Sequence, residues 1–208
     1  HRAITMRDYE ELVLEHFPEV DKAQCIAIPQ ENALLGICIV VFSCAEDSRY
    51  FLSSAWKLEE IRRAVSRYTS PFVTVKVVNP QYEKIEVYCR VVLRDNPQRY
   101  ESKVLRQLVV LAQNCIAPWY RKREIPDSGQ SFSYKELHAR MVNHEDLLRL
   151  VLLEVDGVSL PDVDVETEDH VFKGSKPWSI LLPEIKIELL SPGDGIEKAE
   201  IGGNFIIK

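Results

Sequence analysis

Apolar residues recur at helical spacing in several parts of the chain, and capping residues mark where these runs begin. Thr5 followed by Asp8 fits the Ser/Thr-x-x-Asp/Glu capping box, in which each side chain bonds the backbone of the other residue. Ser133 precedes a similar run, and Ser53 or Ser54 can cap another. We therefore expect helices between Thr5 and Pro18, between Ser54 and Pro71, between Pro97 and Pro118, and from Ser133 to about Asn143.

Strands are predicted where apolar residues alternate with polar ones or form short continuous runs. We expect strands over residues 21–28, 34–44, 72–78, 85–93, 147–155, 179–190 and 199–207. The first two should pair across the turn at residues 29–32. Residues 72–78 and 85–93 are expected to form a hairpin around Pro80, because proline cannot donate a hydrogen bond within a sheet.

The order of these elements predicts the α+β class. We expect two small lobes of helices packed on mainly antiparallel sheets, with a ferredoxin-like tendency, followed by a C-terminal β appendage. The predicted division places an α+β lobe at residues 1–95 and a helix-rich lobe, able to share strands with the first, at residues 96–158. An acidic loop and a hairpin-like tail occupy residues 159–208.

The balance of charge narrows the choice of partners. With 32 acidic and 26 basic side chains, the formal net charge is -6 at pH 7. This sign is unfavourable for a protein whose affinity comes from neutralising phosphates, so we expect no nucleic-acid partner. The longest apolar stretch, Leu34 to Cys44, is about half the ~20 residues of a membrane-spanning helix, so we expect no direct membrane insertion. We also expect no secretory leader, and we interpret the chain as a portion of a longer protein.

Motifs that carry catalytic chemistry are scarce in this sequence. It contains no G-x-G-x-x-G, Walker, G-x-S-x-G or H-E-x-x-H motif, and only 8 glycines with which to build phosphate-binding loops. The cysteines are Cys25, Cys38, Cys44, Cys89 and Cys115, with no C-x-x-C pair among them. We expect them to be free, buried thiols in a reducing compartment. The chain is therefore predicted not to be an enzyme and to use no cofactor.

The best candidates for a metal site are His138, His144, Glu145 and Asp146, because two imidazoles and a carboxylate can bind zinc or iron. The two histidines are six residues apart, about 600° around a helix, so one helix would place them on opposed faces. An acidic stretch at residues 162–169 is superficially similar to a calcium loop, but it lacks the turn glycine and the spacing of the final glutamate. We predict no metal site in either place.

Aromatic and arginine residues are the candidates for protein–protein contacts, because these side chains are enriched at the centres of interfaces. The candidates are Trp119, Tyr120, Arg121, Arg123 and Trp178, with Trp56 as the remaining tryptophan. Any of the tryptophans can equally be a core residue. The aromatic and basic cluster near residue 120 is also typical of single-strand nucleic-acid sites, but its three cations are few in a net acidic chain. An exposed loop between lobes, or a contact with an acidic neighbouring subunit, is favoured.

The opening segment of the chain carries a family resemblance. Its residues are Arg2-Ala3-Ile4-Thr5, Asp8-Tyr9, Leu12, Pro18-Glu19-Val20 and Ala23. This order resembles the R-A-V/I-T-x-x-D-Y/F-x-x-L stretch, followed by P-x-V-x-x-A, of the baseplate J-like proteins of contractile phage tails and related contractile injection systems. The strand pair and the proline-started helix that ends near Ala117-Pro118 also resemble that family's later region. The resemblance therefore extends to about residue 120.

This resemblance implies an architectural role. Proteins of the family are wedge components of a baseplate, so the implied partners are other wedge subunits and copies of the chain itself. It also implies assembly in the cytoplasm and a place in a phage tail or tail-like particle. Two alternatives stay open, namely a metal-dependent or small-molecule enzyme on ferredoxin-like lobes, and an adaptor module unrelated to injection machines.

Overall fold

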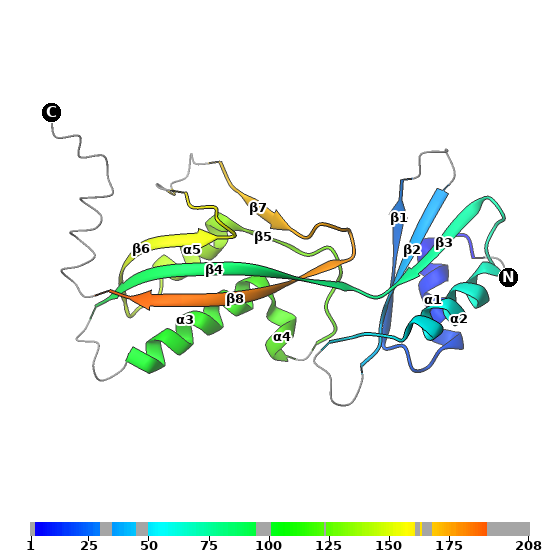
Figure 1. Ribbon diagram of the computed structural model, residues 1–208, viewed down its shortest axis with the longest axis horizontal. Coiled ribbons are helices and arrows are strands. Elements are labelled where there is room, and N and C mark those ends of the chain that lie inside the picture. Colours follow the sequence, from blue (N-terminus) through cyan, green and yellow to red (C-terminus); the bar gives the residue numbers. More distant parts are fainter. Residues whose placement is uncertain are drawn as a thin grey trace. The chain divides into compact units, whose positions relative to one another are not determined.

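The computed structural model describes residues 3–29, 35–44, 50–94, 101–122, 124–160, 163 and 168–190. Within these ranges, five helices and eight strands form open, mixed sheets, which confirms the predicted α+β class (Figure 1). Two compact units share the chain. Unit 1 contains residues 1–83, 122–130 and 174–180, and unit 2 contains residues 84–121, 131–173 and 181–208. The predicted division into lobes at residues 1–95, 96–158 and 159–208 stays a prediction.

Unit 1 contains a three-stranded sheet in the order β1-β2-β3. β1 (Lys22–Ile28) pairs antiparallel with β2 (Leu35–Phe42), as predicted from the sequence. β2 pairs in parallel with β3 (Val73–Val78). Two parallel neighbours need a crossover connection, and helix α2 (Ala55–Ser66) lies within it. The α-β-β-α-β order of unit 1 differs from the β-α-β-β-α-β order of a ferredoxin-like lobe.

Both helices of unit 1 begin at capping residues predicted from the sequence. α1 (Met6–His16) follows Thr5, whose Oγ1 accepts a hydrogen bond from the Asp8 N–H (3.2 Å) while the Asp8 carboxylate accepts one from the Thr5 N–H (2.8 Å). At the start of α2, the Ser54 Oγ accepts a bond from the Lys57 N–H (3.3 Å). These bonds satisfy backbone N–H groups that a helix leaves unpaired at its N-terminus.

The core of unit 1 lies between the two helices and one face of the sheet, and α1 and α2 lie next to the sheet in Figure 1. The helical side of the core consists of Tyr9, Val13, Phe17, Ile61 and Val65. The sheet contributes Ala23, Cys25, Ile37, Ile39 and Val41. These strand residues are all odd-numbered because side chains alternate between the two faces of a sheet.

The even-numbered face of this sheet is covered too. Phe42 has 0% exposure, and it lies opposite Lys22 in the β1–β2 register. The Lys22 ammonium donates to the Asp127 carboxylate (2.5 Å), and the Lys76 Nζ lies 4.7 Å from the centre of the Trp178 ring. Two segments that are distant in sequence, 122–130 and 174–180, therefore complete unit 1 on this face.

The main sheet of unit 2 has the order β6-β4-β8. β4 (Gln81–Leu93) runs antiparallel to β6 (Leu147–Val155), with irregularities in register near the end of β4. β8 (Ser179–Leu189) flanks β4 on the other side. A small separate sheet pairs β5 (Ser131–Ser133) antiparallel with β7 (Val171–Lys173).

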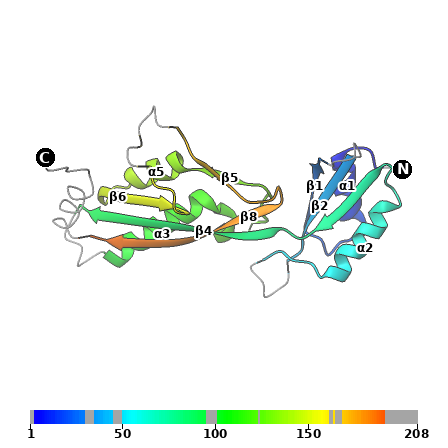
Figure 2. The ribbon, with the colours of Figure 1, turned by 45° about the horizontal axis from the view of Figure 1, so that its top comes forward.

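The helices α3 (Glu101–Ile116), α4 (Pro118–Lys122) and α5 (Tyr134–Val142) follow β4 in the chain. α3 and α5 pack on the odd-numbered face of β4, and both lie along the main sheet of unit 2 in Figures 1 and 2. The helical residues of this core are Val104, Leu108, Ala112, Ile116, Tyr134, Leu137 and Met141. α5 begins at the predicted cap Ser133, whose Oγ accepts a bond from the Glu136 N–H (3.1 Å).

The hairpin predicted for residues 72–78 and 85–93 was wrong. β3 pairs with β2, whereas β4 pairs with β6 and β8. Pro80 does separate the two strands, as expected for a residue that cannot donate within a sheet, but each strand finds its partner elsewhere. Local alternation of apolar residues predicts that a strand exists and which face it buries, but it does not specify the neighbouring strand.

The predicted strand at residues 179–190 is present as β8, which lies next to β4 in the main sheet of unit 2. The Leu190 N–H donates to the Val91 carbonyl oxygen (2.9 Å). The other half of the predicted tail hairpin, residues 199–207, lies outside the described residues, as does the predicted helix start at Pro97. Among the residues described, no helix combines the length and apolar composition needed to cross a bilayer.

Candidate interaction surface

The first turn of α2 carries an exposed tryptophan. Trp56 is 72% exposed, whereas Ile61 and Val65 of the same helix have 0% exposure. Trp56 and Ile61 are about 140° apart around the helix, so the burial of one side chain leaves the other on the outer side. Tryptophan is usually well buried because of its large apolar surface, which makes this position a candidate contact site.

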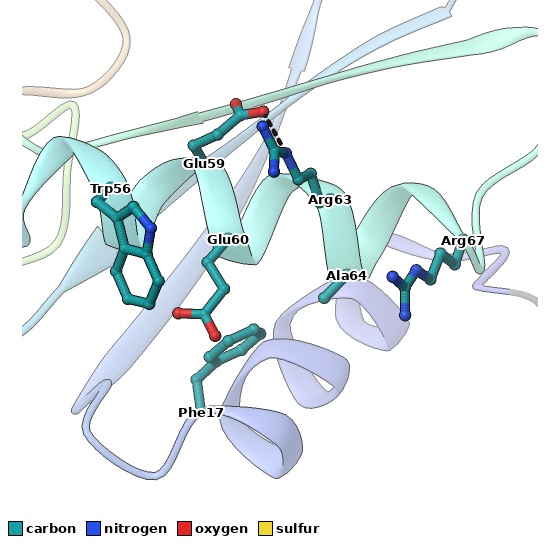
Figure 3. Close-up of a pocket in the computed structure, with 7 residues that line it drawn as sticks. All are labelled: Phe17, Trp56, Glu59, Glu60, Arg63, Ala64 and Arg67. Carbon is teal, nitrogen blue, oxygen red and sulfur yellow. Dashed lines mark hydrogen bonds and ion pairs between the residues drawn. The ribbon is translucent and has the colours of Figure 1, made fainter.

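A hollow of about 410 Å³ lies along α2. It is lined by Phe17, Trp56, Glu59, Glu60, Arg63, Ala64 and Arg67. Figure 3 shows Trp56 and Arg67 at opposite ends of the hollow, with Phe17 between them. Phe17 is the C-cap residue of α1 and is only 7% exposed, so packing holds its ring in place.

A second hollow, of about 310 Å³, borders the same tryptophan. It is lined by Glu19, Ser43, Cys44, Leu52, Ser53, Ser54, Trp56 and Lys57. Leu52 is 47% exposed and adds apolar surface beside the indole. Trp56 contributes to both linings, and we call the residues that line the two hollows the Trp56 surface.

Lys57 places a cation on the Trp56 surface, where it lines the second hollow. Its Nζ forms ion pairs with Glu19 and with Glu60, the latter at 3.0 Å, and lies 4.9 Å from the centre of the Phe17 ring. Hydrogen bonding to Glu19, and then to Glu60, raises the pKa of Lys57, and the same bond lowers the pKa of Glu19. The ammonium is therefore charged at neutral pH and is already paired with two carboxylates.

Glu59 is paired in the same way, whereas Arg67 is not. Arg62 donates two hydrogen bonds to Glu59 (both 2.7 Å) and Arg63 donates one through Nε (2.9 Å). Hydrogen bonds from Arg62, and then from Arg63, lower the pKa of Glu59 to about 2. Arg67 is exposed at the C-cap of α2, and within the described part of the chain no carboxylate forms an ion pair with it. The Trp56 surface therefore presents one guanidinium that is not neutralised.

The predicted contact residues near position 120 occupy different environments. Trp119 lies on α4 in unit 2 and is only 4% exposed, and its ring centre is 5.6 Å from that of Tyr120. Tyr120 is half-buried and Arg121 is exposed. Arg123 lies outside the described residues. A contact role for Trp119, Tyr120, Arg121 and Arg123 stays a prediction.

Trp178 belongs to unit 1 and not to the unit that contains Trp119. It is half-buried under the Lys76 ammonium, and its carbonyl oxygen accepts a bond from the Gln81 N–H (3.1 Å). A cation over an indole face is stabilising, and this pairing helps to hold the 174–180 segment on the sheet. The role of Trp178 as an interface anchor likewise stays a prediction.

The candidate metal ligands are dispersed. Within the described ranges, no group of three or more His, Cys, Asp or Glu side chains is arranged to hold a metal ion. His138 stacks on Tyr134 with ring centres 6.3 Å apart, and burial lowers its pKa. The His144 Nδ1 instead accepts a bond from the Asp146 N–H (3.4 Å). Most of the acidic stretch at 162–169 lies outside the described residues.

The buried cysteines are protonated thiols that pack in the cores. Burial raises the pKa of Cys25 and of Cys89 to about 12, and that of Cys38 to about 11. These three thiols are therefore protonated at neutral pH and pack as small apolar side chains. Cys44 is exposed, contrary to the predicted burial, because it lies just beyond the end of β2, while Cys115 is half-buried.

Comparison with known proteins gives a structural match without a sequence match. Neither the protein-family models nor the curated proteins contain a match to this chain. A chain in the cryo-electron microscopy structure of the anti-feeding prophage baseplate, determined with sixfold symmetry, aligns with 88% of this chain at a TM-score of 0.59. The two chains share a fold. Their sequence identity is 18%, and the aligned part is 38% of the baseplate chain, so this chain spans well under half of that neighbour's length.

Several members of the Trp56 surface were missed by the sequence analysis. Phe17, Lys57 and Arg67 come from the end of one helix and both ends of another, and only the packing of α1 beside α2 brings them together. A partial signal did exist for Trp56. It lies outside the stripe formed by Leu58, Ile61, Ala64 and Val65, so an exposed position could have been predicted from the helical period.

Proposed function

We propose that this chain is an architectural component of a baseplate in a phage tail or a contractile injection system. The observation that carries the proposal is the fold shared with a chain of the anti-feeding prophage baseplate over 88% of this chain. That share exceeds the length of either unit, so the similarity includes parts of both and is not limited to one common motif. Function is assigned through this analogy together with the sequence motif described next.

The capped N-terminal helix supports the finer assignment to the baseplate J-like family. Thr5 and Asp8 of the motif cap α1 reciprocally, and Tyr9 and Val20 are both only 4% exposed. Each of these residues therefore forms α1 or packs it against β1. Arg2 of the motif lies outside the described residues. We infer a wedge component of the baseplate.

The proposed role is carried out through protein–protein contacts. The partners are other wedge subunits and copies of the chain itself, during assembly in the cytoplasm and afterwards in the particle. A net charge of -6 disfavours nucleic acid as a partner, and no direct insertion into a membrane is proposed. The matched baseplate chain is longer than this one, so these partners are proposed only for the surfaces that this chain itself provides.

The proposed role is not catalytic. The buried thiols are held protonated, and His138, whose pKa is lowered by burial, stacks on an aromatic ring. The charged groups along α2 are mostly bonded to one another, as expected for a surface that docks rather than one that transfers protons. These observations favour an assembly role over the enzyme alternative.

Deletion of the segment tests this proposal. An in-frame deletion of residues 1–208 from the encoding gene should abolish intact contractile particles, because a wedge component connects its neighbours in the baseplate. Negative-stain electron microscopy of purified particles measures the outcome, and the same gene restored on a plasmid is the control. Normal numbers of intact particles from the deletion strain would contradict the proposed function.

A further inference from the structure

We propose that the Trp56 surface binds a short segment of a partner protein that carries a large apolar side chain followed, a few residues away, by carboxylates. This inference rests on the proposed function, because it names the chemistry of one partner in the assembly. It differs from that function in committing to one surface of unit 1 and to one kind of occupant.

The apolar half of the site is formed by Trp56, Leu52 and Phe17. Trp56 is 72% exposed and Leu52 is 47% exposed, while the buried Phe17 ring provides a fixed floor in the hollow between Trp56 and Arg67 (Figure 3). Covering an indole of this size removes a large apolar area from water, and tryptophan is among the side chains that contribute most to interfaces. The partner segment must therefore supply a large apolar side chain at this end.

The polar half of the site selects for negative charge. The carboxylates of Glu19, Glu59 and Glu60 are each bonded to a lysine or an arginine, so they are not available to an incoming cation. Arg67 has no such partner among the described residues, and Arg63 contacts Glu59 through Nε alone, which leaves the end of its guanidinium open. The two linings together carry three carboxylates and three cations, so the positive charge is local. Lys57 is shared by Glu19 and Glu60, whereas at the other end Arg62, Arg63 and Arg67 face the single carboxylate of Glu59, and a further carboxylate complements that end.

The spacing of these groups sets the length of the occupant. Trp56 and Arg67 are eleven residues apart on or at the end of α2, about 16 Å along the helix axis, and Trp56 and Arg63 are about 10 Å apart. An extended peptide advances about 3.3 Å per residue. Its carboxylates should therefore lie about three and about five residues from the apolar side chain.

Three labelled heptapeptides provide the direct test, with binding to the purified chain measured by fluorescence anisotropy. The first has phenylalanine at one end and glutamates three and five residues away. The second replaces both glutamates with lysine, and the third replaces phenylalanine with alanine. The first peptide should bind about tenfold more tightly than either of the others.

Substitutions in the chain should remove this preference. Trp56→Ala and Arg67→Gln are each expected to weaken the first peptide about tenfold, because each removes one half of the site. Lys173→Gln is the matched control for loss of one positive charge, since Lys173 is exposed on β7 of unit 2, and it should leave binding unchanged. Equal binding of all three peptides, no measurable binding, or equal affinities for the wild type and both variants would overturn the inference.

Two further outcomes separate this inference from the proposed function. Sedimentation velocity that shows self-association lost on Trp56→Ala would identify the occupant as a second copy, and would overturn the stated acidic segment. Particles that require residues 1–208 but incorporate the W56A–R67Q double variant normally would contradict this inference and leave the proposed function standing. Reduced incorporation of the double variant, with normal incorporation of Lys173→Gln, is the expected result.

Discussion

Replacing Leu108 with alanine is expected to lower the free energy of unfolding by about 3–4 kcal/mol. Leu108 lies on α3 with 0% exposure, and it belongs to the same core as Leu137 and Met141 of α5, which are also fully buried. Truncation leaves a cavity between close-packed helices, and the lost burial and the cavity both destabilise the fold. Urea denaturation followed by circular dichroism measures the loss.

Leu148→Ala is the matched control for this substitution. Leu148 lies on β6 and is 55% exposed, so the same chemical change should alter the free energy of unfolding by no more than about 0.5 kcal/mol. Equal losses from the two substitutions would mean that α3 does not pack against α5 in the core of unit 2.

Replacing Glu83 with alanine is expected to destabilise unit 1 by about 2–3 kcal/mol. The Glu83 carboxylate accepts bonds from the Ser175 N–H (2.8 Å), the Ser175 hydroxyl (2.6 Å) and the Ser179 hydroxyl (2.5 Å). It also accepts one from the Gln81 side chain (2.9 Å). Ser179 is completely buried, so loss of the carboxylate leaves its hydroxyl without this acceptor, and such groups are costly to bury.

The segment that bonds Glu83 is closely packed at Gly174, so no other group can easily move in to replace the lost carboxylate. A Cβ atom added at Gly174 would lie 2.2 Å from the Ser179 Cβ, so the segment that bonds Glu83 has little freedom to move. Glu83→Gln should cost less than Glu83→Ala, because one oxygen still accepts. Glu86→Gln, at an exposed position of the same strand, is the control and should be nearly neutral.

Ionisation of the Glu83 carboxylate should make the stability of the folded chain depend on pH. Burial raises the pKa of Glu83, but the hydrogen bonds from Ser175 and Ser179 outweigh it and lower the pKa overall. A lowered pKa in the folded state means that the contribution is fully present above the unfolded value of about 4.3 and is lost as pH falls through the folded value. Thermal denaturation between pH 7 and pH 3 should show a smaller loss of stability on acidification for Glu83→Gln than for the wild type. An identical pH dependence would contradict the bonding network.

The local elements of this fold could be predicted from the sequence because their causes are local. The bonds that cap α1 join Thr5 to Asp8, three residues apart, and the cap of α5 joins Ser133 to Glu136. The turn after β6 contains Asp156 and Gly157, both with positive φ, as an Asp-Gly pair suggests. Such interactions depend on neighbouring residues alone, so one sequence is enough to find them.

The pairing of strands could not be predicted in the same way. β3 and β4 follow each other with two residues between them, yet they belong to different sheets, and β8 reaches β4 from about 90 residues further along the chain. α2 packs on the sheet that contains β3, and α3 and α5 pack on the sheet that contains β4, so the surroundings of each strand come from distant parts of the chain. For the same reason, the sequence did not reveal that each unit is built from segments that are distant in the chain.

For a related reason, only part of the candidate site could be predicted from the sequence. The identity of Trp56 as an interface residue could be suggested from its residue type and its place outside the buried stripe of α2. That Arg67 has no paired carboxylate could not be predicted from the sequence. Lys57, Arg62 and Arg63 carry the same charge, and they differ from Arg67 only in having carboxylates within reach. Residue type alone did not distinguish Trp119 from Trp56, although their side chains are 4% and 72% exposed.

Cryo-electron microscopy of the intact particle, purified from cells that encode the chain, can show whether the chain is a baseplate component. We expect density for both units in the baseplate, repeated according to the symmetry of that ring, with the Trp56 surface of unit 1 against a neighbouring subunit. A particle that lacks the chain, or that holds it away from the baseplate, would rule out the proposed role.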